Sequence, residues 1–218
     1  MKHVRKLALT AAAAAAGTAL AAPPAHAAPP TVILANGSPY SGNIRMVLTS
    51  PVSVTTSLGT ASCNRGNIDA GVASNGSNLN VSVYNFYNSP GPACTNSAGG
   101  TSTTTPVGLP WNGGDLSYAS GSGTLRINNV QVTSSSSTFL GPIVCNYRGS
   151  GPSNSVTFSV VNSTGTTQVR ATASGASMTK VDAGSNILCP GSATYSAGFD
   201  VFGQTSTGAY TQKLVLTP

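Results

Sequence analysis

Histidine is rare in this chain, and glutamate is absent. Its two histidines, His3 and His26, lie within the first 27 residues, and no glutamate occurs. Without an imidazole after residue 27, the chain cannot form a Ser-His-Asp triad, a Cys-His pair or a His-ligated zinc site. These absences exclude most mechanisms of extracellular hydrolases.

Carboxylates are also scarce, because the only acidic residues are Asp69, Asp115, Asp182 and Asp200. A glycosidase needs two carboxyl groups held across one sugar bond, and we interpret these four as serving turns and solubility instead. One carboxylate with one Asn at positions 182–186 is a thin ligand set for calcium, and no Cys-x-x-Cys occurs. We therefore expect neither a metal nor a cofactor.

Positive charge is present but not clustered. Three of the ten cations, Lys2, Arg5 and Lys6, lie at the start of the chain. The net charge is therefore +6 for the whole chain but +3 for the residues after position 27. Nucleic-acid binding requires a dense basic stripe. The scattered cations predict no nucleic-acid partner.

The first 27 residues have the pattern of a secretory signal peptide. A basic start precedes an apolar run over 7–20 and the small-x-small site Ala25-His26-Ala27. The run is shorter than the ~20 residues of a membrane span, so we expect cleavage, secretion to the medium or cell envelope, and no stable membrane insertion. We expect residues 28–30 to form a linker and residues 31–218 a single domain.

Short stretches of alternating apolar and polar residues, separated by Gly, Pro, Asn and Ser, predict many β-strands and almost no helix. Ala193, Tyr195, Ala197, Phe199 and Val201 recur at every second position, which places them on one face of a strand. The pattern predicts an all-β fold, either an antiparallel β-sandwich or a flattened barrel. The Thr and Ser runs at 101–105 and 134–137 lack apolar residues and predict exposed loops. The pairs Asn36-Gly37, Asn75-Gly76 and Asn112-Gly113 predict tight turns.

Four cysteines in an exported chain predict two disulfides, for which three pairings are possible. We favour sequential pairing, Cys63 with Cys94 and Cys145 with Cys189, because each bond then closes a loop compatible with neighbouring strands.

Several short motifs lie between residues 63 and 202: Cys63-Asn64, Tyr84-Asn85-Phe86 before Cys94-Thr95, Leu109-Pro110-Trp111, Cys145-Asn146-Tyr147-Arg148-Gly149, and Cys189 before Ala193-Thr194-Tyr195-Ser196-Ala197. These motifs resemble those of an uncharacterised family of small secreted β proteins that is widespread in actinobacteria. The resemblance implies a β fold and brings no catalytic residue with it. The final strand departs from the family pattern at Gly198 and Phe199.

Ser177-Met178-Thr179-Lys180 matches the Ser-x-x-Lys pattern of serine enzymes that use a lysine base. That chemistry needs one helical turn, whereas in a strand residues three apart face opposite sides. A Ser-Lys hydrolase is therefore a remote alternative, and we expect no enzyme.

Tyr84, Phe86 and Trp111 are the best candidates for ligand binding. Tyr84 and Phe86 share one face of a predicted strand, and their rings could stack on sugars or contact a protein. Packing in the core is the alternative for Trp111. We expect a non-catalytic extracellular binding or interaction protein whose partner is a polysaccharide, as for a carbohydrate-binding module, or another extracellular protein.

Overall fold

The computed structural model describes residues 31–91, 93–138, 141–162 and 168–218. The predicted signal peptide and linker lie outside these residues. The described part is almost entirely β, as the sequence predicts, with one short 3-10 turn, η1 (Pro152–Asn154). The strands are β1 (Val32–Ala35), β2 (Ser38–Pro39), β3 (Gly42–Thr56), β4 (Gly59–Cys63), β5 (Arg65–Val72), β6 (Leu79–Tyr87), β7 (Cys94–Asn96), β8 (Gly100–Pro106), β9 (Trp111–Ala119), β10 (Ser122–Ile127), β11 (Gln131–Thr138), β12 (Gly141–Gly149), β13 (Val156–Asn162), β14 (Val169–Val181), β15 (Ser192–Gly203), β16 (Gln212–Lys213) and β17 (Val215–Thr217).

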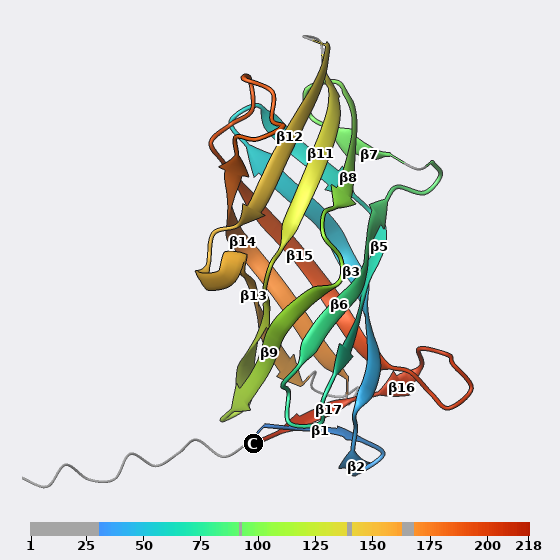
Figure 1. Cartoon of the computed structure of the whole chain (residues 1–218). Helices are drawn as coiled ribbons and strands as arrows, with labels where there is room; N and C mark the ends of the chain where they lie inside the picture. Colours follow the sequence, from blue (N-terminus) through green and yellow to red (C-terminus); the bar gives the residue numbers. More distant parts are fainter. Residues whose placement is uncertain (1–30, 92, 139–140, 163–167) are drawn as a thin grey trace, which may run out of the picture.

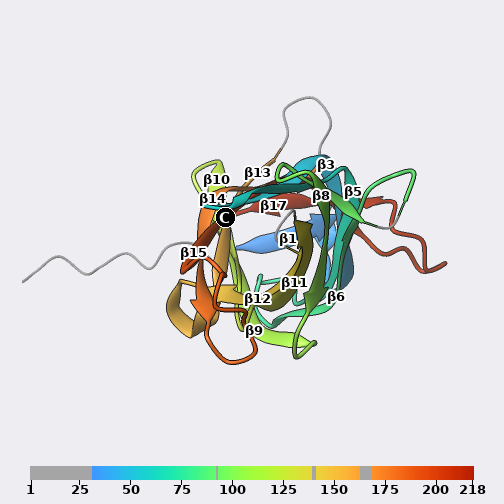
Figure 2. The ribbon, with the colours of Figure 1, turned by 90° about the horizontal axis from the view of Figure 1, so that it is seen from above.

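The main sheet closes on itself. Antiparallel pairing runs through β3, β5, β6, β9, β10, β13, β14 and β15, and β15 then pairs with β3. A second closed path runs from β3 through β4, β7, β8, β11 and β12 to β14 and β15, because β12 also pairs with β14. Of the two expected architectures, the closed paths correspond to the flattened barrel. Figure 2 shows the resulting ring of strands from above.

Three long strands belong to both closed paths. These are β3 with 15 residues, β14 with 13 and β15 with 12, and they run through much of the height of the molecule (Figure 1). We call the end formed by β4, β7, β8, β11 and β12 the upper end, as in Figure 1. The long strands hold the upper and lower halves together as one closed sheet.

Pro51 and Gly175 lie where the long strands change partners. β3 pairs with β5 up to Val47 and with β4 from Val52 onward, so the missing N–H of Pro51 removes no bond to either neighbour. Gly175 has φ +62 and lies in a register shift of β14, between its segments paired to β13 and to β12. Both residues therefore occupy positions where regular pairing is interrupted.

A small sheet of β17, β1 and β2 covers the lower end. Its hairpin between β1 and β2 has Asn36 at φ 50 and Gly37 at φ 79, which confirms the predicted tight turn. The Thr31 hydroxyl bonds the backbone of Tyr118, accepting from its N–H at 2.7 Å. This contact joins the small sheet to the main sheet at β9.

The core fills the interior of the closed sheet. All five alternating residues predicted from β15, from Ala193 to Val201, are buried, while the residues between them are exposed or partly exposed. Apolar residues from both halves belong to one continuous buried cluster. Both predicted disulfides are present, Cys63–Cys94 and Cys145–Cys189. Within the described residues, no helix has the length and apolarity that crossing a membrane requires.

Two predicted loops are strands instead. Residues 101–105 belong to β8 and 134–137 to β11, and these two strands pair with each other. β-Branched Thr fits a pleated surface well. The backbone hydrogen bonds of these strands come from pairing with neighbours that are distant in the sequence, which the polar composition could not indicate. Asn112-Gly113 is also not a hairpin turn, because it lies inside β9 with Gly113 at φ +80.

Candidate functional site

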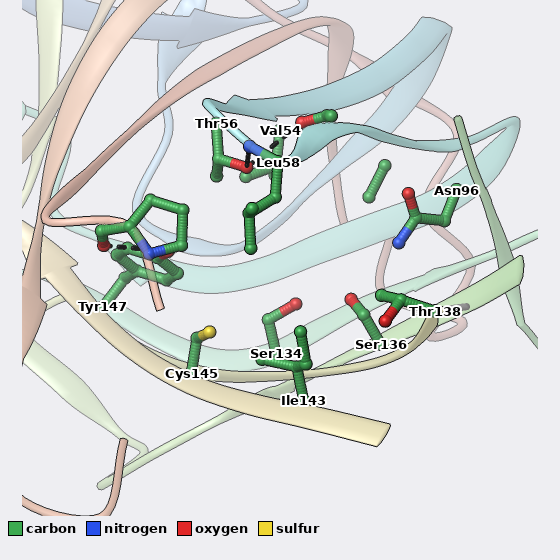
Figure 3. A pocket seen from close by; sticks show the side chains of 13 residues that line it. Val54, Thr56, Leu58, Asn96, Ser134, Ser136, Thr138, Ile143, Cys145 and Tyr147 are labelled. Carbon is green, nitrogen blue, oxygen red and sulfur yellow. Dashed lines mark hydrogen bonds between the residues drawn. The ribbon is translucent and has the colours of Figure 1, made fainter. Parts of the chain in front are cut away.

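An open pocket lies inside the upper end, between β3 and β4 on one side and β11 and β12 on the other (Figure 3). We call it the upper pocket. It is lined by Val54, Thr56, Leu58, Gly59, Ala61, Asn96, Ser134, Ser136, Thr138, Ile143, Cys145, Tyr147 and Pro190. Its walls therefore come from strands that are far apart in the sequence.

Hydroxyl groups from β11 form part of one wall. Period-2 alternation directs Ser134, Ser136 and Thr138 inward, whereas Ser135 and Ser137 are exposed on the outer face. The Ser136 hydroxyl lies 2.9 Å from that of the buried Ser102, and the Ser134 hydroxyl lies 3.4 Å from it. These bonds fix the orientation of the serine side chains beside the pocket.

Apolar side chains face this hydroxyl wall. In Figure 3, Leu58 points into the pocket from the turn between β3 and β4, opposite Ser134 and Ser136. The turn is held by Thr56, whose hydroxyl accepts a hydrogen bond from the Leu58 N–H at 3.2 Å and donates to the Gly59 carbonyl at 3.2 Å. The pocket can thus contact a ligand that is polar on one side and apolar on the other.

The upper pocket contains no charged side chain among its lining residues. Its one phenol, that of Tyr147, donates a hydrogen bond to the Pro190 carbonyl at 3.2 Å, and burial raises the pKa of this phenol. The cavity volume is about 60 Å³. Pockets that enclose drug-sized ligands typically measure roughly 300–1,000 Å³, so this pocket fits the end of a ligand.

The predicted aromatic platform does not lie on the surface. Phe86 and Trp111 are only 6% and 1% exposed, and Tyr84 is partly buried. The Tyr84 ring meets the Phe86 ring at 82° and the Trp111 ring at 58°, and the Trp111 Nε1–H donates to the Val107 carbonyl at 2.8 Å. These rings pack in the interior, which is the alternative expected for Trp111, and their faces are not free to stack on a sugar.

The Ser-x-x-Lys motif lies in a strand, and the four carboxylates form ion pairs. Ser177 and Lys180 lie in β14, and Lys180 Nζ lies 2.9 Å from the Asp182 carboxylate. Each of the four carboxylates pairs with a cation, in Arg45–Asp69, Arg126–Asp115, Arg170–Asp200 and Lys180–Asp182. Among the described residues, no group of three or more His, Cys, Asp or Glu side chains could hold a metal ion.

Apart from the disulfide cysteine Cys145, the residues that line the upper pocket were not predicted as site residues from the sequence. The alternation Ser134, Ser136, Thr138 was available as a signal, but only its pairing with β8 and β12 shows that one face lies inside.

Comparisons with family models, with curated proteins and with solved structures found no match.

Proposed function

We propose that this chain is an exported, non-catalytic binding protein whose site is the upper pocket. The ligand is a small neutral molecule, or the exposed end of a larger one, with an apolar face and one hydrogen-bonding edge. The observation that carries this proposal is the open, uncharged pocket, in which the Ser134 and Ser136 hydroxyls of one wall face the aliphatic side chain of Leu58.

The absence of charge from the lining determines the ligand class. Moving an ionised group from water into such a site has a large desolvation cost unless an opposite charge is present. Leu58 and Ile143 offer apolar contact, and the Ser134 and Ser136 hydroxyls can each both donate and accept. A neutral ligand with mixed polarity therefore fits the pocket better than an acid or an amine.

Two further features support export and a non-catalytic role. Disulfides persist in oxidising compartments, and the chain begins with the pattern of a signal peptide. Each carboxylate is engaged with a cation, and Lys180 pairs with Asp182 instead of activating Ser177. The polysaccharide alternative depended on exposed rings at Tyr84, Phe86 and Trp111, and the packing of these rings in the interior removes that support.

A matched pair of serine variants tests the proposal. Ser136 faces the pocket and the adjacent Ser135 faces solvent on the same strand. We expect the wild type to bind the neutral fluorophore N-phenylnaphthylamine, Ser136→Leu to weaken binding about tenfold or more by occupying the pocket, and Ser135→Leu to leave binding unchanged. Tenfold corresponds to about 1.4 kcal/mol.

Far-ultraviolet circular dichroism and urea midpoints verify that both variants fold. The proposal fails if the wild type binds neither the fluorophore nor any competing neutral alcohol, ketone or amide. It also fails if Ser135→Leu and Ser136→Leu weaken binding equally, because the site would then not lie inside the upper end.

A further inference from the structure

Two smaller cavities lie near the upper pocket and have wall residues in common with it or with each other. The first, which we call the middle cavity, has a volume of about 10 Å³ and shares Val54 and Ala61 with the upper pocket. The second, the inner cavity, has a volume of about 20 Å³ and shares Tyr84 with the middle cavity. Neighbouring cavities in this series are thus separated by no more than the side chains that line both.

Tyr195 contributes a buried hydroxyl to this series. It is 3% exposed and lines the inner cavity, and its hydroxyl has no hydrogen-bond partner. Tyr195 lies directly opposite Val54 in the pairing of β15 with β3, and Val54 lines the upper pocket. Tyr195 is therefore the cross-strand neighbour of a residue in the wall of the proposed ligand site.

The inner cavity has room for a small hydrogen-bonding group. A buried cavity needs roughly 10–15 Å³ to hold one water molecule, and the inner cavity exceeds this. An unpaired buried hydroxyl is costly, and buried polar groups in folded proteins nearly always have a partner. Tyr195 and Tyr84 both line this cavity, so a group placed in it lies beside both residues.

We infer that the inner cavity is a polar subsite that holds one water molecule in the free protein and exchanges it for the hydroxyl or carbonyl end of a neutral ligand. This inference rests on the proposed function, since the ligand enters from the upper pocket. The middle cavity, at about 10 Å³, is too small for an alkyl chain as it stands, so the apolar side chains of Val52, Val54, Ala61 and Phe86 move apart around the alkyl part when the ligand enters. The Tyr195 phenol then bonds the polar end of the ligand.

The surroundings select against ionised end groups. No residue lining the three cavities is charged. Burial raises the pKa of both Tyr84 and Tyr195, and the neighbouring Tyr84 raises that of Tyr195 further, so both phenols stay protonated at neutral pH. A carboxylate would have no cation to pair with, whereas an alcohol or ketone can accept a hydrogen bond from Tyr195.

The test compares ligands that differ only at one end. n-Octanol, n-octanoate and n-chlorooctane compete with bound N-phenylnaphthylamine in the full chain, with Tyr195→Phe as the variant. Tyr87→Phe is the matched control, because Tyr87 is an exposed phenol on the strand that carries Tyr84. We expect the wild type to prefer octanol to both other ligands. Tyr195→Phe should reduce the preference for octanol over chlorooctane about tenfold, because one hydrogen bond to the octanol hydroxyl is lost. Tyr87→Phe should leave this preference unchanged.

A double-mutant cycle, followed by urea unfolding, tests whether the inner cavity holds a water molecule in the free protein. If one water bridges both phenols, Tyr84→Phe and Tyr195→Phe each lower the urea midpoint, and the double variant loses less than the sum of the two. A higher midpoint for Tyr195→Phe, or strict additivity, overturns the bound water. Fluorophore binding with an octanol preference that is insensitive to Tyr195→Phe overturns the subsite alone, whereas no fluorophore or ligand binding at all overturns the proposed function.

Discussion

Removal of the Cys145–Cys189 disulfide should strongly destabilise this protein. The bond joins residues separated by 44 positions and anchors the connection between β14 and β15 to β12. In the chain-entropy model, opening a loop of this length lowers the free energy of unfolding by about 4 kcal/mol. Typical domains have roughly 5–15 kcal/mol in total. The double variant Cys145→Ala/Cys189→Ala should therefore lose a large part of its stability.

The single tryptophan provides the assay. Trp111 is 1% exposed, so its fluorescence reports exposure of the interior during urea unfolding. Cys63→Ala/Cys94→Ala is the matched comparison, because its separation of 31 positions gives about 3.7 kcal/mol in the same model. The two double variants should lose nearly equal free energy despite their different places in the fold.

Two results would contradict this reasoning. A loss below about 1 kcal/mol for either pair would mean that the reduced chain remains restricted without the bond, against the entropic model. A large difference between the two pairs would show that local packing, and not loop length, determines the effect. If a variant is unfolded in buffer, sulfate stabilises it enough for the comparison, with all proteins measured in the same salt.

Two further predictions concern buried rings. Trp111→Ala should lower the free energy of unfolding by about 3–5 kcal/mol, the usual effect of deleting a large core ring, and it also leaves the Val107 carbonyl without its indole donor. Thermal unfolding followed by circular dichroism measures this loss of stability. A loss below about 1 kcal/mol would mean that the ring is not packed. Stability should also fall in alkali, because burial raises the pKa of Tyr84 and Tyr195 above the ordinary value of 10.0, so their contribution is complete below that pH and is lost as the pH rises through the folded pKa. Urea midpoints across this range should fall less steeply for Tyr84→Phe/Tyr195→Phe, and an equal slope would contradict the assignment.

Local sequence patterns were sufficient for the fold class. Alternation from Ala193 to Val201 depends only on the two-residue repeat of a strand, so it places these residues on one strand face without knowledge of the neighbours. The favoured sequential pairing of the cysteines, one of three possible pairings, is confirmed by the structure. The runs at 101–105 and 134–137 were misassigned, because polar strands gain their stability from partners on both sides, and composition does not reveal partners.

The candidate site depended on tertiary structure. The sequence placed Tyr84 and Phe86 on one strand face, but closure of the sheet through β3 and β15 made that face the interior. The same closure brought Leu58 opposite Ser136, residues 78 positions apart by their numbers. The sequence by itself determined the β class, the number of cysteines, the lack of glutamate and the lack of imidazole after residue 27, because these depend on residue identity and local repeat. Which faces became inside, and hence where a ligand can bind, was decided only when distant strands paired.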